Sequence, residues 1–372
     1  MEGLADGPFS GCDYYTAQTG LPVRSDYLCA KMKQDPTAAT RKQDHIELAF
    51  QSQVERAILD PRFNYEPLLA PHPTEGGLPA RNFLGKTFQT PIWVSSMTGG
   101  TGMAGTINQN LARACAEFGM GMGLGSCRQL LFDNSTLADF AVRPLIGEQP
   151  LYANLGVAQL EELIDQGKLE AVRELVKKLE ADGLIIHVNP LQEWLQPEGD
   201  RFKRSSLQII ETVLERLDMP MIVKEVGQGM GPASLRALLQ LPLEAVDFAA
   251  SGGTNFARLE LLRGNPVRAK VFQKLAHIGH SPEQMVELTN RIVAELGDDL
   301  RCRQIIISGG VRDFLDGYYL MQKLSIPSVY GQASAFLAHA RSDYEQLRAH
   351  VLGQLRGLEL AHAFLRLRED GQ

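Results

Sequence analysis

The chain has 372 residues, of which 44% are hydrophobic and 22% are charged, and this composition excludes a wholly disordered or fibrous protein. Its 37 Lys and Arg against 44 Asp and Glu give a formal net charge of −7, so the overall balance does not favour a protein that neutralises nucleic-acid phosphates. The five cysteines are an odd number without a C-x-x-C pair, which is typical of a reducing compartment. No apolar run is long enough to span a membrane, and the first 30 residues lack the order of a signal peptide. We therefore expect a cytoplasmic protein with no nucleic-acid or membrane partner.

The first 40 residues contain scattered Gly, Pro, Thr and Asp without a sustained period of 2 or 3.6. Such a segment is typical of a poorly ordered extension. No low-complexity tract or linker divides the rest of the chain. We expect residues 1–40 to be an extension and residues 41–372 to be a single domain.

From Pro91 onward, short apolar runs alternate with longer amphipathic ones, a pattern that predicts alternating strands and helices. A helix is predicted over 160–179, where apolar residues keep one stripe. Another begins at Ser281 with a capping box to Gln284 and ends at Gly297. One or two closing helices are predicted between Asp343 and Arg368. The predicted strands are 92–97, 120–124, 151–154, 184–188, 221–225, 246–250, 304–307 and 328–331.

Eight near-continuously apolar strands that alternate with helices predict a parallel sheet buried on both faces. The fold class is therefore α/β, and the expected architecture is a (β/α)8 TIM barrel with an N-terminal arm and C-terminal closing helices. Active sites of such barrels lie at the carboxyl ends of the strands. In this chain the residues that follow the predicted strands are rich in polar side chains and glycine.

Two glycine turns follow the last predicted strands, at Ser308 to Arg312 and at Gly331 to Ser334. Glycine lets backbone N–H groups approach a phosphate, and barrel phosphate sites favour the last strands. Either turn alone is as well explained by tight chain reversal. Because neither a P-loop nor a G-x-G-x-x-G motif is present, a flavin mononucleotide (FMN) is the natural candidate, with Lys224 beside the electron-rich part of its ring.

The segment from His187 to Glu193 places an imidazole, two carboxamides and a carboxylate directly after a predicted strand. Glu193 is open to three interpretations: a Mg²⁺ ligand shared with substrate phosphates, a general base, or an exposed loop charge. A lone His187 is more often a core histidine than a catalyst. Arg41 and Lys42 form either a solvated charged patch or a diphosphate clamp that closes over the barrel.

Taken together, these motifs resemble the type 2 isopentenyl-diphosphate isomerases, a flavin-dependent family. The resemblance spans Arg41 to about Ala338. The motifs that carry it are RKQDHI at 41, SSMTGG at 95, GSCR at 125, HVNPLQEWLQPEGDRF at 187, VKEVGQGM at 223, SGGTN at 251 and SGGVR at 308.

The resemblance implies isomerisation of isopentenyl diphosphate to dimethylallyl diphosphate in isoprenoid biosynthesis, with reduced FMN as acid and base, Mg²⁺, and NADPH or NADH as the flavin reductant. It implies catalytic roles for Gln192 and His187, Mg²⁺ binding by Glu193, and a homo-oligomer. The implied substrate-binding residues are Arg41, Lys42, Ser126, Cys127, Arg128, Asn189 and Gln192. The implied flavin contacts are Ser96, Met97, Thr98, Ser126, Asn154, Lys224, Ser251, Thr254, Gly309, Gly310, Val311, Arg312, Ala333 and Ser334.

Two other functions remain open at this point. An FMN-dependent 2-hydroxy-acid oxidase or dehydrogenase would share Lys224 and the late glycine turns, but it needs a histidine-arginine pair, and the stretch LAHIGHSPEQ at 275–284 lacks the arginine. A non-catalytic phosphate-binding barrel gives no reason for the dense polar run at 187–193. In the isomerase family Cys127 occupies a position that usually carries Gln.

Overall fold

The computed structural model describes residues 37–96 and 102–368. These residues fall into two compact units, one that ends at Asp60 and one that begins at Pro61. The first unit contains helix α1 (Ala38–Leu48) and the short 3-10 helix η2 (Arg56–Ile58). Helix α1 begins just inside the segment expected to be an extension, and none of its residues is buried.

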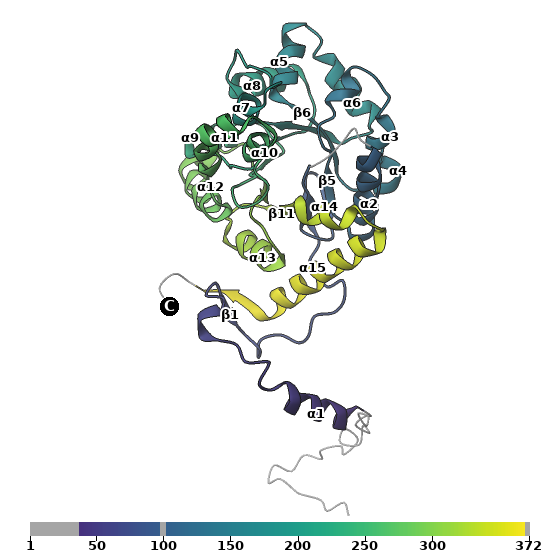
Figure 1. Ribbon diagram of the computed structural model, residues 1–372, viewed down its shortest axis with the longest axis vertical. Coiled ribbons are helices and arrows are strands. Elements are labelled where there is room, and N and C mark those ends of the chain that lie inside the picture. The colour runs from purple at the N-terminus through teal and green to yellow at the C-terminus, as the bar shows by residue number, and fades with distance from the viewer. Residues whose placement is uncertain (1–36, 97–101, 369–372) are drawn as a thin grey trace, which may run out of the picture. The chain divides into compact units, whose positions relative to one another are not determined.

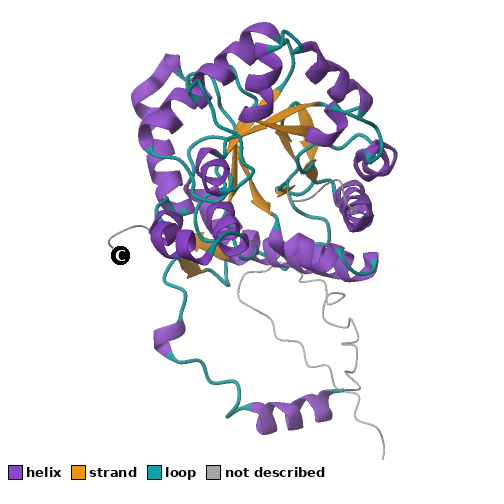
Figure 2. Ribbon diagram, turned by 45° about the horizontal axis from the view of Figure 1, so that its top comes forward, coloured by secondary structure: helices purple, strands orange, loops and turns teal. Residues whose placement is uncertain are grey.

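The second unit is built around a closed barrel of eight parallel strands, which lies at the centre of a ring of helices (Figure 1, Figure 2). The strands follow one another in chain order, and β11 closes the barrel by pairing with β4. All eight predicted strands are present, so the predicted (β/α)8 class is confirmed. The strands are β4 (Ile92–Val94), β5 (Gly121–Gly123), β6 (Leu151–Gly156), β7 (Gly183–His187), β8 (Met221–Lys224), β9 (Ala245–Asp247), β10 (Ile305–Ser308) and β11 (Ser328–Gln332).

Helices cover the outside of the barrel and close it at the C-terminus. They are α2 (Gly102–Phe118), α3 (Leu137–Phe140), α4 (Arg143–Ile146), α5 (Val157–Asp165), α6 (Glu170–Lys178), α7 (Pro190–Leu195), α8 (Ser206–Arg216), α9 (Pro232–Leu239), α10 (Phe256–Arg263), α11 (Pro266–Phe272), α12 (Pro282–Leu296), α13 (Phe314–Lys323), α14 (Ser334–Ala340) and α15 (Tyr344–Phe364), with 3-10 turns η3 (Arg128–Leu131), η4 (Gln273–His277) and η5 (Gly297–Asp299). No helix in the described ranges is both long and apolar enough to cross a membrane.

Two helix predictions had different outcomes. Helix α12 has the predicted capping box between Ser281 and Gln284 and ends at Gly297, which adopts a positive φ. The single helix predicted over 160–179 is wrong, because the chain forms α5 and α6 instead. Gly167 lies between them with φ +66, a left-handed conformation that interrupts a helix.

The C-terminal segment forms the predicted closing helix and one strand that was not predicted. Helix α15 starts at the N-cap Asp343 and packs against α2, α13 and α14. The chain then continues into β12 (Leu365–Leu367), which pairs antiparallel with β1 (Phe63–Tyr65). The two ends of the barrel unit are thereby joined in one small sheet.

A hairpin packs with the inner layer of barrel side chains. It consists of β2 (Arg81–Phe83) and β3 (Lys86–Phe88), which pair antiparallel. Phe83 and Phe88 are fully buried and belong to one cluster with Trp93 and Tyr152. Because Trp93 and Tyr152 lie on barrel strands, this aromatic cluster fills the inside of the barrel, on the side of the hairpin.

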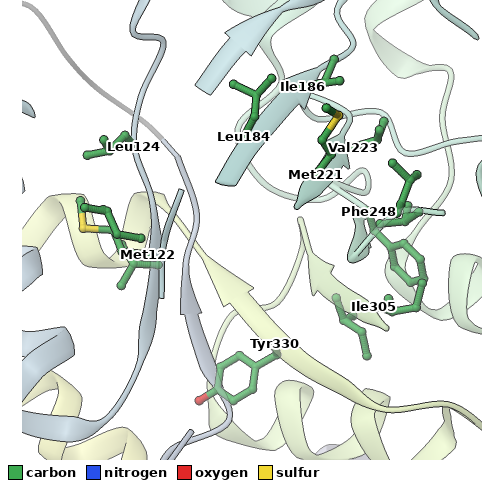
Figure 3. Packing of buried hydrophobic residues seen from close by; sticks show 14 of the residues in the cluster. Met122, Leu124, Leu184, Ile186, Met221, Val223, Phe248, Ile305 and Tyr330 are labelled. Carbon is green, nitrogen blue, oxygen red and sulfur yellow. The ribbon is translucent and has the colours of Figure 1, made fainter. Parts of the chain in front are cut away.

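Successive residues of each strand point alternately to the outside and the inside of the barrel, because side chains in a strand have a period of 2. Both sides are apolar. Met221 and Val223 belong to the main core between strands and helices, which Figure 3 shows together with Leu184 and Ile186. The residue between them, Ile222, belongs to the inner cluster. The direction in which each strand-end residue points therefore follows from this alternation.

Candidate active site

A layer of polar side chains lies inside the barrel, nearer to the carboxyl ends of the strands than the inner apolar cluster. Tyr152, Ile185, Ile222, Ala245 and Ile306 belong to that cluster, and a step of two residues along each strand returns to the same face. This step leads to polar residues on five strands. They are Asn154, His187, Lys224, Asp247 and Ser308.

The larger of two adjoining cavities lies over the second half of the barrel and has a volume of about 420 Å³. The loops that follow β8, β9, β10 and β11 form most of its wall, with Ser95 and Ser96 after β4. Its predicted flavin contacts are Ser96, Lys224, Thr254, Gly309, Gly310, Val311, Arg312, Ala333 and Ser334.

The glycine turns let two loops of this cavity come close together. Gly309 has φ +81, and a Cβ there would lie 2.0 Å from the carbonyl oxygen of Ala250. Gly252 has φ +120, and its Cβ would lie 2.9 Å from the Cα of Gly310. Only glycine fits at both positions, so the turns shape the cavity wall.

We expect Gly309→Ala to destabilise the barrel and distort this wall. Strain at a positive φ costs about 1–3 kcal/mol, and the contact with the backbone of Ala250 adds to it. Gly167→Ala is the matched control, since Gly167 has φ +66 but no atom within 4 Å of the position that a Cβ would take. Urea unfolding of both variants checks the difference, and equal losses of stability would contradict the crowding argument.

The smaller cavity, about 210 Å³, lies over the first half of the barrel. Loops after β5, β6 and β7 form its wall, and Ser96, Lys224, Val226 and Phe256 line both cavities. The predicted residues that line it are Ser126, Arg128, Asn154, His187, Asn189, Gln192 and Glu193. The structure therefore brings most of the predicted substrate and metal residues together.

Short helix α7 positions Gln192 and Glu193, and its N-cap Asn189 holds both. The Nδ2 of Asn189 donates to the Oε1 of Gln192 at 3.1 Å and to the Oε1 of Glu193 at 3.0 Å. The second oxygen of Glu193 accepts a hydrogen bond from the backbone N–H of Asp200 at 2.8 Å. Glu193 is 8% exposed, so these two bonds and its burial hold the carboxylate in one orientation.

Two carboxylates beside these residues were not predicted. Glu260 on α10 is 2% exposed and accepts from the Nε2 of Gln192 at 3.2 Å, and it pairs with Arg263 at 2.6 Å. Asp200 pairs with Arg128 at 3.0 Å. The helix that carries Glu260 meets the site only in the folded chain, so no local pattern indicated this residue, whereas Asp200 lies within the motif at 187–202 and was given no role.

His187 forms one defined hydrogen bond in the polar layer. Its Nδ1 lies 2.7 Å from the Oδ1 of Asn154, whose Nδ2 donates to the carbonyl of Leu124. Nδ1 therefore carries the proton and Nε2 keeps its lone pair. Burial, together with the charge of Lys224, lowers the pKa of His187 to about 4, so the ring is neutral at pH 7.

This lowered pKa predicts an acid-sensitive contribution to stability. Below pH 6.5 the unfolded chain protonates His187 while the folded chain does not, so stability falls as the pH drops toward about 4, by up to about 3 kcal/mol. His187→Gln should remove this contribution. Chemical denaturation between pH 7 and pH 4 measures it, with His277→Gln, a change at an exposed ring, as the control. A variant that retains the full acid sensitivity of the wild type would contradict the assignment.

Several predicted residues lie elsewhere. Cys127 is fully buried, and its Sγ donates to the carbonyl of Gly125, so its thiol does not line the cavity. Ser251 directs its Oγ toward the carbonyl of Gln228 at 3.4 Å. Arg41 and Lys42 lie on α1 in the first unit. Met97 and Thr98 lie outside the described residues.

Arg312 lines the larger cavity but is paired within its own segment. Its Nε donates to Asp316 at 2.8 Å and its backbone N–H donates to the same carboxylate at 3.1 Å. The side-chain bond and the negative charge of Asp316 raise the pKa of Arg312. Its side chain is 77% exposed, so the guanidinium can also reach an anion in the cavity.

Within residues 37–96 and 102–368, no group of three or more His, Cys, Asp or Glu side chains is arranged to hold a metal ion. Glu193 is thus a single buried carboxylate at the wall of the smaller cavity.

The polar layer and the two adjoining cavities lie at the carboxyl ends of the strands of a closed (β/α)8 barrel. Active sites of barrel enzymes lie at this end. The protein is therefore a (β/α)8-barrel enzyme. No family model matches the chain. Among solved structures, a double mutant of flavocytochrome b2 with pyruvate bound matches with a TM-score of 0.54 at 15% identity, over 86% of this chain and 82% of that one. At this identity the match shows the fold alone.

Curated relatives decide the family. The isopentenyl-diphosphate delta-isomerase of Rickettsia felis is 34% identical over 324 residues, which cover 84% of this chain and 88% of the relative. The enzyme of the same name from Rickettsia conorii is 35% identical over 84% of this chain and 89% of its own length. The chain belongs to the isopentenyl-diphosphate delta-isomerase family, and the resemblance inferred from its motifs is confirmed.

Proposed function

We propose that the chain interconverts isopentenyl diphosphate and dimethylallyl diphosphate by a 1,3-allylic proton shift, with FMN in the larger cavity and Mg²⁺ with the substrate in the smaller one. One observation carries the proposal. The cavity with the glycine turns and the cavity with Arg128, Gln192 and Glu193 share Lys224 and Ser96 as wall residues. Groups bound in the two cavities would therefore be in contact.

The larger cavity fits a flavin nucleotide by the chemistry of its walls. The Oγ atoms of Ser95 and Ser96 and the Oε1 of Gln332 are buried and have no hydrogen-bond partner among the described residues, as expected of groups that await a polar ligand. Gly309, Gly310 and Arg312 would hold the phosphate, and Lys224 would lie at the ring. Bound in its reduced form, FMN would supply an acid-base group and an electron-rich ring beside the reacting carbons.

The smaller cavity suits a diphosphate with a divalent cation. Magnesium usually keeps several waters and takes one or two carboxylates in addition to substrate phosphates, and Glu193 supplies one such carboxylate. Arg128 would bind the diphosphate by its guanidinium, with Ser126 beside it. The family resemblance also assigns Arg41 and Lys42 to the binding of the substrate diphosphate.

The isoprenoid chain would lie against Gln192. Its amide is fixed at both ends, because Asn189 donates to its oxygen and Glu260 accepts from its nitrogen. A side chain held in this way can orient the substrate for the proton shift, which is the catalytic role that we assign to Gln192. His187 would contribute a neutral imidazole that accepts through Nε2 and does not donate from it.

The remaining parts of the proposal follow from the family. NADPH or NADH would keep the flavin reduced without being consumed in each turnover, the chain would assemble as a homo-oligomer, and it would act in the cytoplasm.

The test is conversion of isopentenyl diphosphate by the purified chain with FMN, Mg²⁺ and NADPH, followed by analysis of the product. We expect dimethylallyl diphosphate, and no conversion when FMN or the reductant is left out. Oxidation of lactate or a related 2-hydroxy acid without any isomerisation would refute the proposal and favour the oxidase alternative. A chain that binds no FMN would refute both flavin-dependent functions.

A further inference from the structure

Asp247 is a buried carboxylate for which the reaction described above leaves no role. We propose that Asp247 is the internal counter-ion of Lys224 and thereby limits the positive charge that Lys224 presents to a flavin in the larger cavity. The second half of this proposal rests on the proposed function, and the first half does not.

Asp247 lies in the polar layer directly beside Lys224. The two residues are register partners on the neighbouring strands β8 and β9, and both fall on the inner face by the alternation that places Ile222 and Ala245 in the inner cluster. Asp247 is 0% exposed and Lys224 is 8% exposed. Lys224 lines both cavities, whereas Asp247 lines neither, so a ligand would contact the lysine and not the carboxylate beside it.

The hydrogen bonds of Asp247 leave half of its carboxylate unsatisfied. Its Oδ1 accepts from the Oγ of Ser308, and that Oγ in turn accepts from the backbone N–H of Ala249 at 3.0 Å. Its Oδ2 is buried and has no hydrogen-bond partner within the described part of the chain. A buried carboxylate in this state depends on a nearby cation.

We assign this role to Lys224, its register partner on β8. Burial raises the pKa of Asp247, and the charge of Lys224 is the largest influence that opposes the rise, ahead of the bond from Ser308. The Nζ of Lys224 donates to the carbonyl of Glu225 at 2.8 Å, and this bond holds the ammonium group at the carboxyl end of β8.

The neighbouring acid, Glu225, has a different purpose. Its Oε2 accepts from the backbone N–H groups of Gly227, Gln228 and Gly229 at 2.7, 2.6 and 3.1 Å. This carboxylate is used to shape the loop after β8. Asp247 makes no bond to the loop after β8, and the balance of charge with Lys224 is the contribution that we assign to it.

The charge balance matters because reduction adds negative charge to a flavin. A lysine with a partly neutralised charge stabilises the reduced ring less than an uncompensated one. Asp247→Asn removes the charge but keeps an oxygen that can accept from Ser308. In this variant Lys224 should favour the reduced flavin more strongly.

The first test needs no flavin and compares melting temperatures of the full chain at pH 7. Lys224→Met should lower the melting temperature, because it leaves Asp247 buried without its cation. Adding Asp247→Asn to Lys224→Met should raise it again. If the double variant melts at the same temperature as Lys224→Met or below it, the two side chains are not a counter-ion pair and the proposal is overturned.

The second test measures the reduction potential of bound FMN. For Asp247→Asn we expect the affinity for reduced FMN, relative to oxidised FMN, to increase about tenfold, which is about 30 mV for a two-electron couple. Asp182→Asn is the matched control, because Asp182 is a partly buried carboxylate that precedes β7 at the opposite end of the barrel, and its potential should equal that of the wild type. An unchanged or lowered potential in Asp247→Asn would overturn the proposed effect on the flavin.

The two tests also separate this proposal from the proposed function. A wild-type chain that binds no FMN would refute the proposed function and the flavin part of this inference together. The melting comparison would still decide whether Asp247 and Lys224 are paired.

Discussion

Glu193→Ala is expected to lower kcat/KM for isopentenyl diphosphate at least about 100-fold while FMN remains bound. Loss of residues that merely orient metal ligands already costs about 10–100-fold, so loss of the ligand itself should cost more. Glu193 lines the smaller cavity and not the larger one, so the flavin should not be affected. The Mg²⁺ concentration needed for half-maximal rate should rise as well.

Glu198→Ala is the matched control for this variant. Glu198 belongs to the same segment, is about half exposed, and pairs with Arg263 on the surface, where ion pairs contribute little. We expect near wild-type kinetics from it. If Glu193→Ala lowered FMN affinity as much as it lowered turnover, the separation of a metal site from a flavin site would be wrong.

Lys224→Met is expected to raise the Kd for FMN by about tenfold to 100-fold, since a hydrogen bond to a charged group contributes about 1.5–3 kcal/mol. Lys224 is buried at the boundary of the two cavities, so turnover should fall together with flavin binding. Titration of the flavin-free chain with FMN, followed by flavin fluorescence, measures the change.

Lys86→Met provides the comparison for Lys224→Met. Lys86 lies on the hairpin strand β3 and pairs with Asp182 at the opposite end of the barrel. It should bind FMN as the wild type does. An equal loss of flavin affinity in both variants would indicate general destabilisation and would contradict a specific role for Lys224.

The strands and the strand-end residues were predictable because they depend on local patterns. A buried parallel strand has a near-continuous apolar run, and the carboxyl end of that run marks where a side chain can reach the site. This is why His187, Asn189, Gln192 and Glu193 were found together.

Other features depend on contacts between distant segments and left no local pattern. Glu260 meets Gln192 across 68 positions of sequence, and Asp247 resembles an ordinary strand residue until the register places it beside Lys224. Cys127 occupies a motif position, yet its thiol is turned away from the cavity into the core. The break between α5 and α6 depends on the backbone conformation of Gly167, which an apolar stripe does not reveal.

The two cavities divide the carboxyl ends of the barrel strands into two halves. Strand ends and loops of β5, β6 and β7 supply most of the smaller cavity, and those of β8 to β11 supply nearly all of the larger one. Lys224 and Ser96 line both cavities and lie at the two boundaries between these halves. Substitutions in the first half of the barrel would therefore change the wall of the smaller cavity and leave most of the wall of the larger one as it is.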